Sequence, residues 1–149
     1  LIGQGRMADV TLCLGRAWEL RGTVMEGERR GRRLGVPTAN LDTGVQMLPA
    51  DGVYAGSATV DGRRYAVALS VGVKPTFDQP VRVAEAHLIG FEGDLYGRTV
   101  DVGVLRWLRD QQRFGSVEAL IGQLRYDLAL IGELDGQGLL DPTKVVARC

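Results

Sequence analysis

The chain has 149 residues, of which 45% are hydrophobic and 24% charged, the composition of an ordinary globular protein with enough sequence for one domain and its core. Eighteen Lys and Arg residues balance eighteen Asp and Glu residues, so no net charge would attract nucleic acid. No apolar run approaches the roughly 20 residues that cross a bilayer. The two cysteines, Cys13 and Cys149, indicate reduced thiols in the cytoplasm rather than a disulfide framework, and with one histidine a Cys/His zinc site is all but excluded.

The chain opens at Leu1 and runs directly into sequence that is typical of a folded domain. We therefore expect residues 1–14 to be the remnant of a preceding domain or a linker. Residues 15–135 would form the domain itself, and residues 136–149, whose signals are weak, a tail.

From Arg16 to about Leu105 the sequence predicts short β-strands. The segments YAGSATV and RRYAVALSV flank Asp61-Gly62, which is a strong signal for a two-residue hairpin. Three segments alternate apolar residues with a period of two, as strands with one buried face do. The alternating sets are Tyr65, Val67, Leu69 and Val71; Val83, Glu85, His87, Ile89 and Phe91 opposite Ala84, Ala86 and Leu88; and Val100, Val102 and Val104.

After Gly115 the apolar residues recur at helical spacing, from Val117 to Ile131. Ser116 is suited to cap this helix, which we expect to run to about Leu134 and to cover the strands. Short antiparallel strands followed by one helix favour a small closed β-barrel, because closure leaves no strand edge exposed.

The segment GERRGRRLGVPTAN, residues 27–40, carries glycines at every fourth position, Gly27, Gly31 and Gly35, with four arginines between them. Glycine weakens helices and strands, so this is a loop. It is either a solvated surface connection or a phosphate-binding flap of backbone N–H groups and guanidinium groups. It is not a P-loop, because the ending GKS or GKT is absent.

The end of that segment, PTAN, places two small polar side chains after a fixed backbone. Pro37 restricts the chain, and Thr38 and Asn40 point the same way if it is extended. A hydroxyl and an amide carbonyl are neutral oxygen ligands that could help hold Mg²⁺ together with phosphate and water. The alternative is a turn in which both side chains bond nearby backbone.

Glu85 lies on a strand with apolar residues on both faces, so we expect its carboxylate to be partly buried. Such a glutamate could act as a general base, and His87, on the same face, could do likewise. The alternative is a carboxylate paired with an arginine at the barrel rim.

Taken together, these segments resemble the riboflavin kinase family over about residues 14–134. The resemblance is strongest to the kinase module of the bacterial bifunctional riboflavin kinase/FAD synthetases. The matching segments, in family order, are GERRGRRLGVPTANL, LPADGVYAG, SVGVKPTFD, AEAHLIGFEGDLYGR and LRWLRDQQRFGSVEALIGQLRYD.

The resemblance implies an all-β fold, a six-stranded antiparallel Greek-key barrel with a C-terminal helix. It implies transfer of the γ-phosphoryl group of ATP to the 5′-hydroxyl of riboflavin, with Mg²⁺. The family's Glu-x-His element makes Glu85 the base, which also contacts riboflavin, and Thr38 and Asn40 would bind Mg²⁺ and nucleotide phosphate. The other residues implied are Gly27, Gly31, Arg33, Gly35 and Pro37 in a flap over ATP, and Arg109, Arg113 and Phe114 near the flavin.

Three positions depart from the usual bacterial pattern, namely Val36, Ser70 and Lys74, and they bear on nucleotide affinity and pocket detail. The resemblance also implies an adenylyltransferase domain N-terminal to this one in the parent chain, whose His-x-Gly-His-type motif is absent here. The competing hypotheses are a catalytically silent flavin-binding or protein-binding barrel and, less favoured because of the neutral charge, an RNA-binding barrel.

Overall fold

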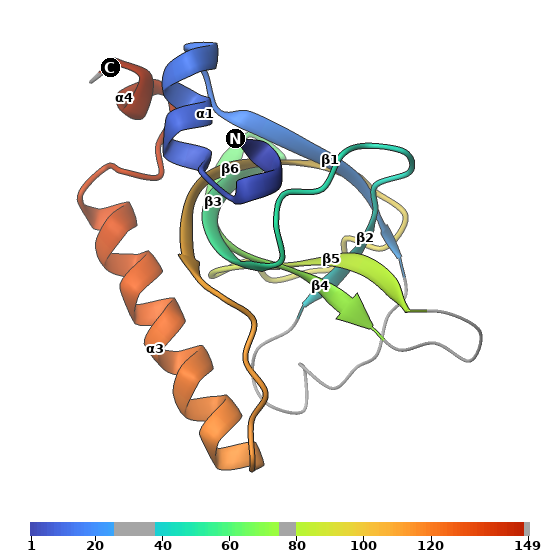
Figure 1. Cartoon of the computed structure of the whole chain (residues 1–149). Helices are drawn as coiled ribbons and strands as arrows, with labels where there is room; N and C mark the ends of the chain where they lie inside the picture. Colours follow the sequence, from blue (N-terminus) through green and yellow to red (C-terminus); the bar gives the residue numbers. More distant parts are fainter. Residues whose placement is uncertain (26–37, 75–79, 148–149) are drawn as a thin grey trace.

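The computed structural model of the chain describes residues 1–25, 38–74 and 80–147, and six strands in these ranges close into a β-barrel (Figure 1). Their order around the barrel is β1-β2-β5-β4-β3-β6, and all neighbours are antiparallel. The connections from β2 to β3 and from β5 to β6 lead to strands that are not neighbours, which is the Greek-key pattern. The predicted barrel is therefore confirmed. The strands are β1 (Trp18–Met25), β2 (Ala39–Asp42), β3 (Gly52–Val60), β4 (Arg63–Lys74), β5 (Val81–Leu88) and β6 (Thr99–Arg109).

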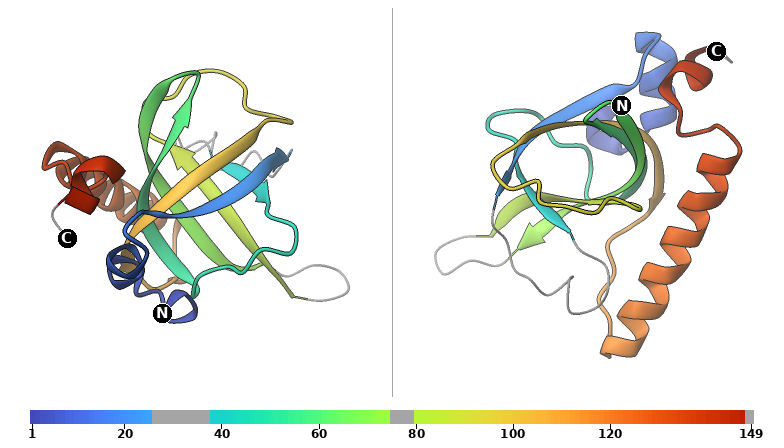
Figure 2. Two further views of the ribbon diagram at one scale, coloured as in Figure 1. Left: turned by 90° about the horizontal axis from the view of Figure 1, so that it is seen from above. Right: turned by 180° about the vertical axis from the view of Figure 1, so that it is seen from behind.

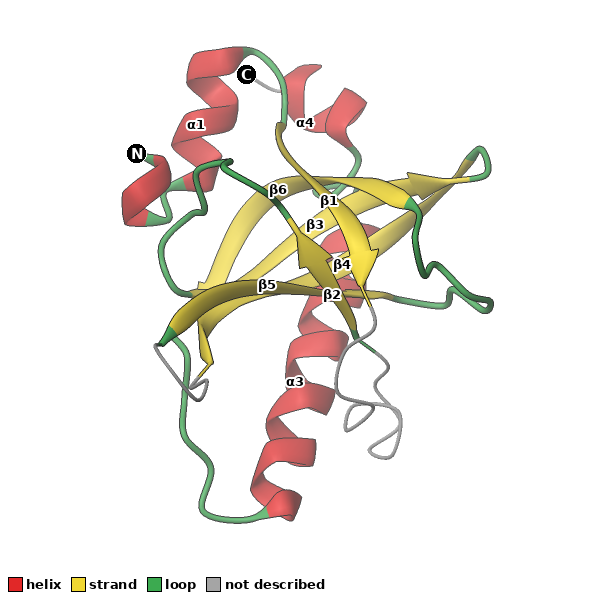
Figure 3. Ribbon diagram, turned by 90° about the vertical axis from the view of Figure 1, so that its right-hand side faces the viewer, coloured by secondary structure: helices red, strands yellow, loops and turns green. Residues whose placement is uncertain are grey.

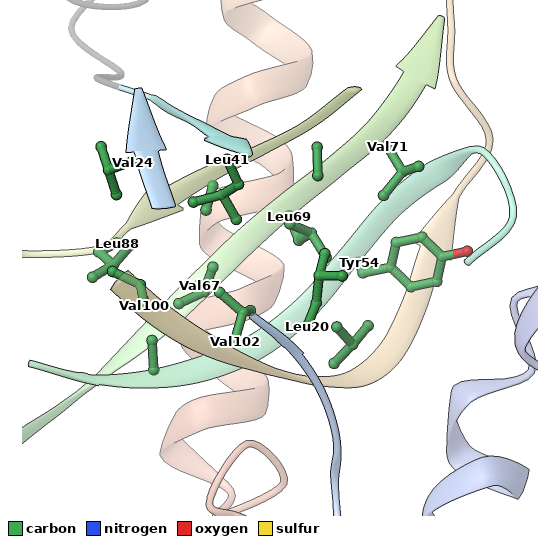
Figure 4. Close-up of a cluster of buried hydrophobic side chains, with 14 of the residues drawn as sticks. Leu20, Val24, Leu41, Tyr54, Val67, Leu69, Val71, Leu88, Val100 and Val102 are labelled. Carbon is green, nitrogen blue, oxygen red and sulfur yellow. The ribbon is translucent and has the colours of Figure 1, made fainter. Parts of the chain in front are cut away.

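The barrel interior is filled by the apolar side chains that the period-two alternation predicts. Val67, Leu69 and Val71 of β4 are fully buried there beside Val102 of β6 (Figure 4). Tyr54 of β3 is also fully buried, and its hydroxyl donates a hydrogen bond to the carbonyl of Ala50 at 2.6 Å. Burial raises the pKa of Tyr54 above its ordinary value.

The predicted hairpin at Asp61-Gly62 joins β3 to β4. Both residues have positive φ angles, 52° and 80°, as a two-residue hairpin turn of the primed type requires. This turn fixes the register of β4, and with it the face on which each β4 side chain lies.

Helix α3 (Val117–Gly136) lies along the outside of the barrel, and Ser116 caps it by accepting a hydrogen bond from the N–H of Ala119 at 3.1 Å. Its second half covers the sheet, where Ile131 is fully buried against small residues such as Ala55 and Ala66. The first half extends beyond the barrel (Figure 3), and Val117 is 47% exposed. The predicted helix is confirmed, but it covers the strands with its second half.

The N-terminal residues pack on one end of the barrel. A short 3-10 helix, η1 (Ile2–Gln4), is followed by α1 (Met7–Leu14), whose Met7 and Val10 are buried in the same apolar cluster as the barrel interior. Helix α4 (Pro142–Ala147), in the segment predicted as a tail, lies at this end too (Figures 1 and 2). The proposed division at residue 14 stays a prediction. None of the helices in the described ranges is long and apolar enough to span a membrane.

Candidate active site

A row of polar side chains crosses three neighbouring strands on the outer face of the barrel. In the strand register Asn40 of β2 is opposite Glu85 of β5, and Glu85 is opposite Ser70 of β4. Residues opposite each other on antiparallel strands point to the same face, with Cβ atoms about 4.5–5.5 Å apart. The adjacent residues Leu41 and Ala84 are buried in the barrel interior, so the row faces outward. The structure thus brings two of the predicted site residues, Asn40 and Glu85, side by side.

Glu85 is half-buried, as its strand pattern predicts, and its Oε1 atom is shielded from solvent. His87 lies two residues further along the same face, opposite Ala68. Thr38 is exposed and lies directly before β2, two residues from Asn40. Both candidates for a general base therefore lie on the outer face, and one of the proposed metal ligands, Asn40, lies opposite Glu85.

A pocket of about 430 Å³ separates this face of β4 and β5 from the linker that joins β6 to α3, residues 110–116. Glu85 lines it from β5 and Arg113 lines it from the linker, so a third predicted residue, Arg113, borders the same pocket as Glu85. Sequence reasoning missed Asp51 and Gln111, which also line it. Both lie in segments that carry the family resemblance, LPADGVYAG and LRWLRDQQRFGSVEALIGQLRYD, but the resemblance gave neither residue a role.

On its other side the linker borders an apolar pocket of about 360 Å³ at the start of α3. Phe114, Val117 and Leu120 line this pocket, and Phe114 is half-buried. Arg113 and Phe114, neighbours in the sequence, therefore border two different pockets, one polar and one apolar.

Arg109, predicted to lie near the flavin, has its guanidinium bound by a carboxylate of the helix. Its Nε donates to both carboxylate oxygens of Asp127 at 3.1 Å, and its Nη2 donates to Oδ2 at 2.8 Å. The side chains are only 15% and 5% exposed. Gln123 donates to the same carboxylate at 2.9 Å. Arg109 therefore fastens the end of β6 to α3, just before the linker, and a contact with the flavin stays a prediction.

The remaining predicted residues lie in the glycine-arginine segment. Gly27, Gly31, Arg33, Gly35 and Pro37 fall outside the described residues, so their proposed contacts with ATP stay predictions. Within the described ranges, no three His, Cys, Asp or Glu side chains come together in a group that could hold a metal ion. The neutral oxygens of Thr38 and Asn40 stay the predicted ligands of Mg²⁺.

A model of the flavokinase family, riboflavin kinase, matches residues 14–134. The chain belongs to the riboflavin kinase family, as its sequence motifs predict. It is 38% identical over 117 residues to a bifunctional riboflavin kinase/FMN adenylyltransferase from Pseudomonas fluorescens, a match that covers 78% of this chain and 38% of the relative. It is 34% identical over 127 residues to an RNA-binding riboflavin kinase from Bacillus subtilis, which covers 84% of this chain and 55% of the relative. The chain thus spans about half or less of the length of these relatives.

Two solved structures share the fold. A crystal structure described as a macrolide-efflux protein from Streptococcus pneumoniae aligns with a TM-score of 0.81 at 37% identity, covering 87% of this chain and 43% of that one. Riboflavin kinase from Trypanosoma brucei aligns with a TM-score of 0.62 at 24% identity, covering 85% and 84% of the two chains. The second likeness supports the barrel architecture alone.

Proposed function

We propose that this chain transfers the γ-phosphoryl group of ATP to the 5′-hydroxyl of riboflavin, giving FMN and ADP. Membership of the riboflavin kinase family supports the substrates. The observation that carries the assignment to this site is the register of β2 and β5, which sets Asn40 beside Glu85. A catalytically silent flavin-binding or protein-binding barrel would not need a half-buried carboxylate next to a potential metal ligand and facing a pocket.

Glu85 acts as the general base in this proposal. Its carboxylate accepts the proton of the ribityl 5′-hydroxyl as that oxygen bonds to the γ-phosphorus, and the bond from phosphorus to the bridging oxygen of ADP breaks. The pocket that Glu85 lines admits a flexible polyhydroxyl chain, and its buried Oε1 atom keeps the carboxylate partly shielded from water. Phosphoryl transfer is mostly positioning and charge neutralisation, so the base supplies only part of the rate.

Thr38 and Asn40 hold the metal ion and nucleotide phosphate in this proposal. Their neutral oxygens fit a Mg²⁺ ion that arrives with ATP, since such an ion takes most of its shell from phosphates and water. When bound, Mg²⁺ would neutralise charge on the transferred phosphoryl group. The glycine-arginine segment from Gly27 to Gly35, which runs into Pro37, is predicted to cover the phosphates of the same ATP.

The flavin ring is assigned to the linker side of the site. Phe114 borders an apolar pocket suited to a planar ring, while Arg113 faces the polar pocket that holds Glu85. Arg109 supports the positions of Arg113 and Phe114 through its contact with Asp127, because this contact fixes the point at which the linker begins.

We further propose that the parent protein carries an adenylyltransferase domain before this one, as the name of the Pseudomonas relative indicates for that protein.

A cytoplasmic location also stays a prediction, based on the use of cysteine. We propose no nucleic-acid partner, because the chain is electrically neutral. The word RNA-binding in the name of the Bacillus relative describes that protein.

The chain supplied with ATP, Mg²⁺ and riboflavin is expected to form FMN and ADP in equal amounts, and no FAD. Adenylylation of FMN needs a second nucleotide site, and in this proposal the polar residues of the barrel already belong to the kinase site. Liquid chromatography with fluorescence detection separates the three flavins and measures the result. Absence of FMN would refute the kinase assignment. Formation of FAD would refute the proposal that a separate domain carries the adenylyltransferase activity.

Thr38→Ala and Asn40→Ala are each expected to raise the Mg²⁺ concentration needed for half-maximal turnover. Losing one ligand of the ion weakens positioning and charge neutralisation together. A magnesium titration at saturating ATP measures the effect, with Thr59→Ala, an exposed threonine of β3, as the matched control. Titration curves that coincide with the unmodified chain for both variants would show that the two residues only brace the start of β2.

A further inference from the structure

Gln111 joins the linker of residues 110–116 to the barrel at the edge of the Glu85 pocket. Its Nε2 lies 2.7 Å from Oγ of Ser70, 2.9 Å from the carbonyl oxygen of Val71 and 3.3 Å from that of Gly52. Gly52 and Val71 are opposite each other on β3 and β4. One amide group, with two N–H bonds, thus serves acceptors on two strands, and one of these acceptors belongs to the residue opposite Glu85.

The barrel is shaped to receive this side chain at Gly72. A Cβ atom on Gly72 would lie 3.2 Å from Nε2 of Gln111 and 3.4 Å from its Cδ and Cγ atoms. The φ of Gly72 is not positive, so its backbone would accept another residue. A side chain at Gly72 would therefore press on Gln111, which would have to shift by a few tenths of an ångström.

Among the described residues, Gln111 alone joins the linker to the barrel by hydrogen bonds. Both ends of the linker are fixed at α3. At its start Arg109 binds Asp127 of the helix, and at its end Ser116 caps the helix. Among the residues that the structure describes, no other hydrogen bond joins residues 111–115 to the barrel. Arg113 and Phe114, which line the two pockets, follow Gln111 by two and three residues.

We propose that Gln111 is a positioning residue for riboflavin. It holds the linker against β3 and β4, and so sets the width of the Glu85 pocket and the places of Arg113 and Phe114. In this proposal it acts through the linker on the flavin side of the reaction, and not on ATP or the transferred phosphoryl group. This inference rests on the proposed function for its kinetic part, while the attachment of the linker can be measured without any turnover.

Gln111→Met tests the proposal, because methionine keeps the length and volume of the side chain but donates no hydrogen bond. Gly72→Ala is the second variant, since it crowds Gln111 without altering the linker. Gln137→Met is the control, an exposed glutamine at the end of α3 that lines neither pocket. The first measurement is the rate at which trypsin cuts after Arg113, followed by mass spectrometry, which reports how often the linker leaves the barrel.

We expect Gln111→Met to raise the rate of cutting after Arg113 about tenfold, as the loss of two or three hydrogen bonds implies, and Gly72→Ala to raise it in the same direction. Gln137→Met should leave the rate unchanged. We expect the KM for riboflavin to rise about tenfold in Gln111→Met, while kcat and the KM for ATP stay within about twofold of the unmodified values. If Gln111 served stability alone, Gln111→Met would not raise the KM for riboflavin while leaving the KM for ATP unchanged.

Unchanged cutting after Arg113 in Gln111→Met would refute the attachment. Faster cutting with an unchanged KM for riboflavin would refute the positioning role. If the unmodified chain makes no FMN, the proposed function fails, and the dissociation constant of riboflavin, measured by quenching of its fluorescence, replaces KM. Failure to bind riboflavin would then refute the positioning role as well, whatever trypsin shows.

Discussion

Glu85→Gln is expected to lower kcat by about 10² to 10⁴ while riboflavin and ATP remain bound. The amide keeps the shape of the carboxylate, which stands between Asn40 and Ser70, but it cannot accept the proton of the ribityl hydroxyl. Rapid-quench measurement of FMN formation with both substrates saturating separates this effect from binding, since only the chemical step should slow.

Two variants accompany this measurement. Glu92→Gln changes an exposed glutamate in the loop after β5 and should leave turnover unaltered. His87→Gln tests the other candidate on the same face of β5, and we expect at most a modest loss. If Glu85→Gln keeps nearly normal turnover while His87→Gln loses it, the base is the histidine. If both variants keep nearly normal turnover, the reaction uses no general base from this strand.

Asp127→Asn is expected to destabilise the fold by about 3 kcal/mol, because it leaves the guanidinium of Arg109 largely buried without a compensating charge. Arg109 and Asp127 are 15% and 5% exposed, and their bidentate contact joins β6 to α3. Urea unfolding followed by circular dichroism measures the change. We also expect a weaker hold on riboflavin, since α3 and the linker would lose a common anchor.

Asp61→Asn provides the matched control. Arg98 also binds Asp61 with two hydrogen bonds, but these side chains are 45% and 74% exposed, and solvent screens such a pair. Asparagine also tolerates the positive φ at this turn. We expect its urea midpoint to match the unmodified chain. Equal loss of stability in both variants would show that burial does not distinguish the two pairs.

The strands and the main helix could be predicted because their periodicity reflects burial directly. Val67, Leu69 and Val71 alternate in the sequence and lie together inside the barrel. The apolar spacing after Ser116 likewise predicts α3, yet it could not show that only the second half of the helix lies on the sheet. That depends on the small residues Ala55 and Ala66, which leave room for Ile131.

The sequence predicts a candidate site as a set of residues, but not how those residues are arranged. Family resemblance selects Asn40 and Glu85, but their contact depends on the register between β2 and β5, and β2 has only four residues with little pattern of its own. Arg109 was assigned by its neighbourhood in the family, whereas the partner of its charge, Asp127, lies 18 residues away on a helix. Gln111 lies in a segment that carries the resemblance, but its hydrogen bonds could not be predicted, because the acceptors lie on strands that precede it by some forty to sixty residues.

The central claim is that riboflavin receives the γ-phosphoryl group of ATP at this site. The most direct test incubates the chain with riboflavin, Mg²⁺ and ATP labelled with phosphorus-32 at the γ position, and follows the label by chromatography. We predict that the label appears in FMN, one atom for each ADP formed, and that Glu85→Gln slows its appearance at least a hundredfold. Label found only in inorganic phosphate or left in ATP, with riboflavin unchanged, would contradict the account.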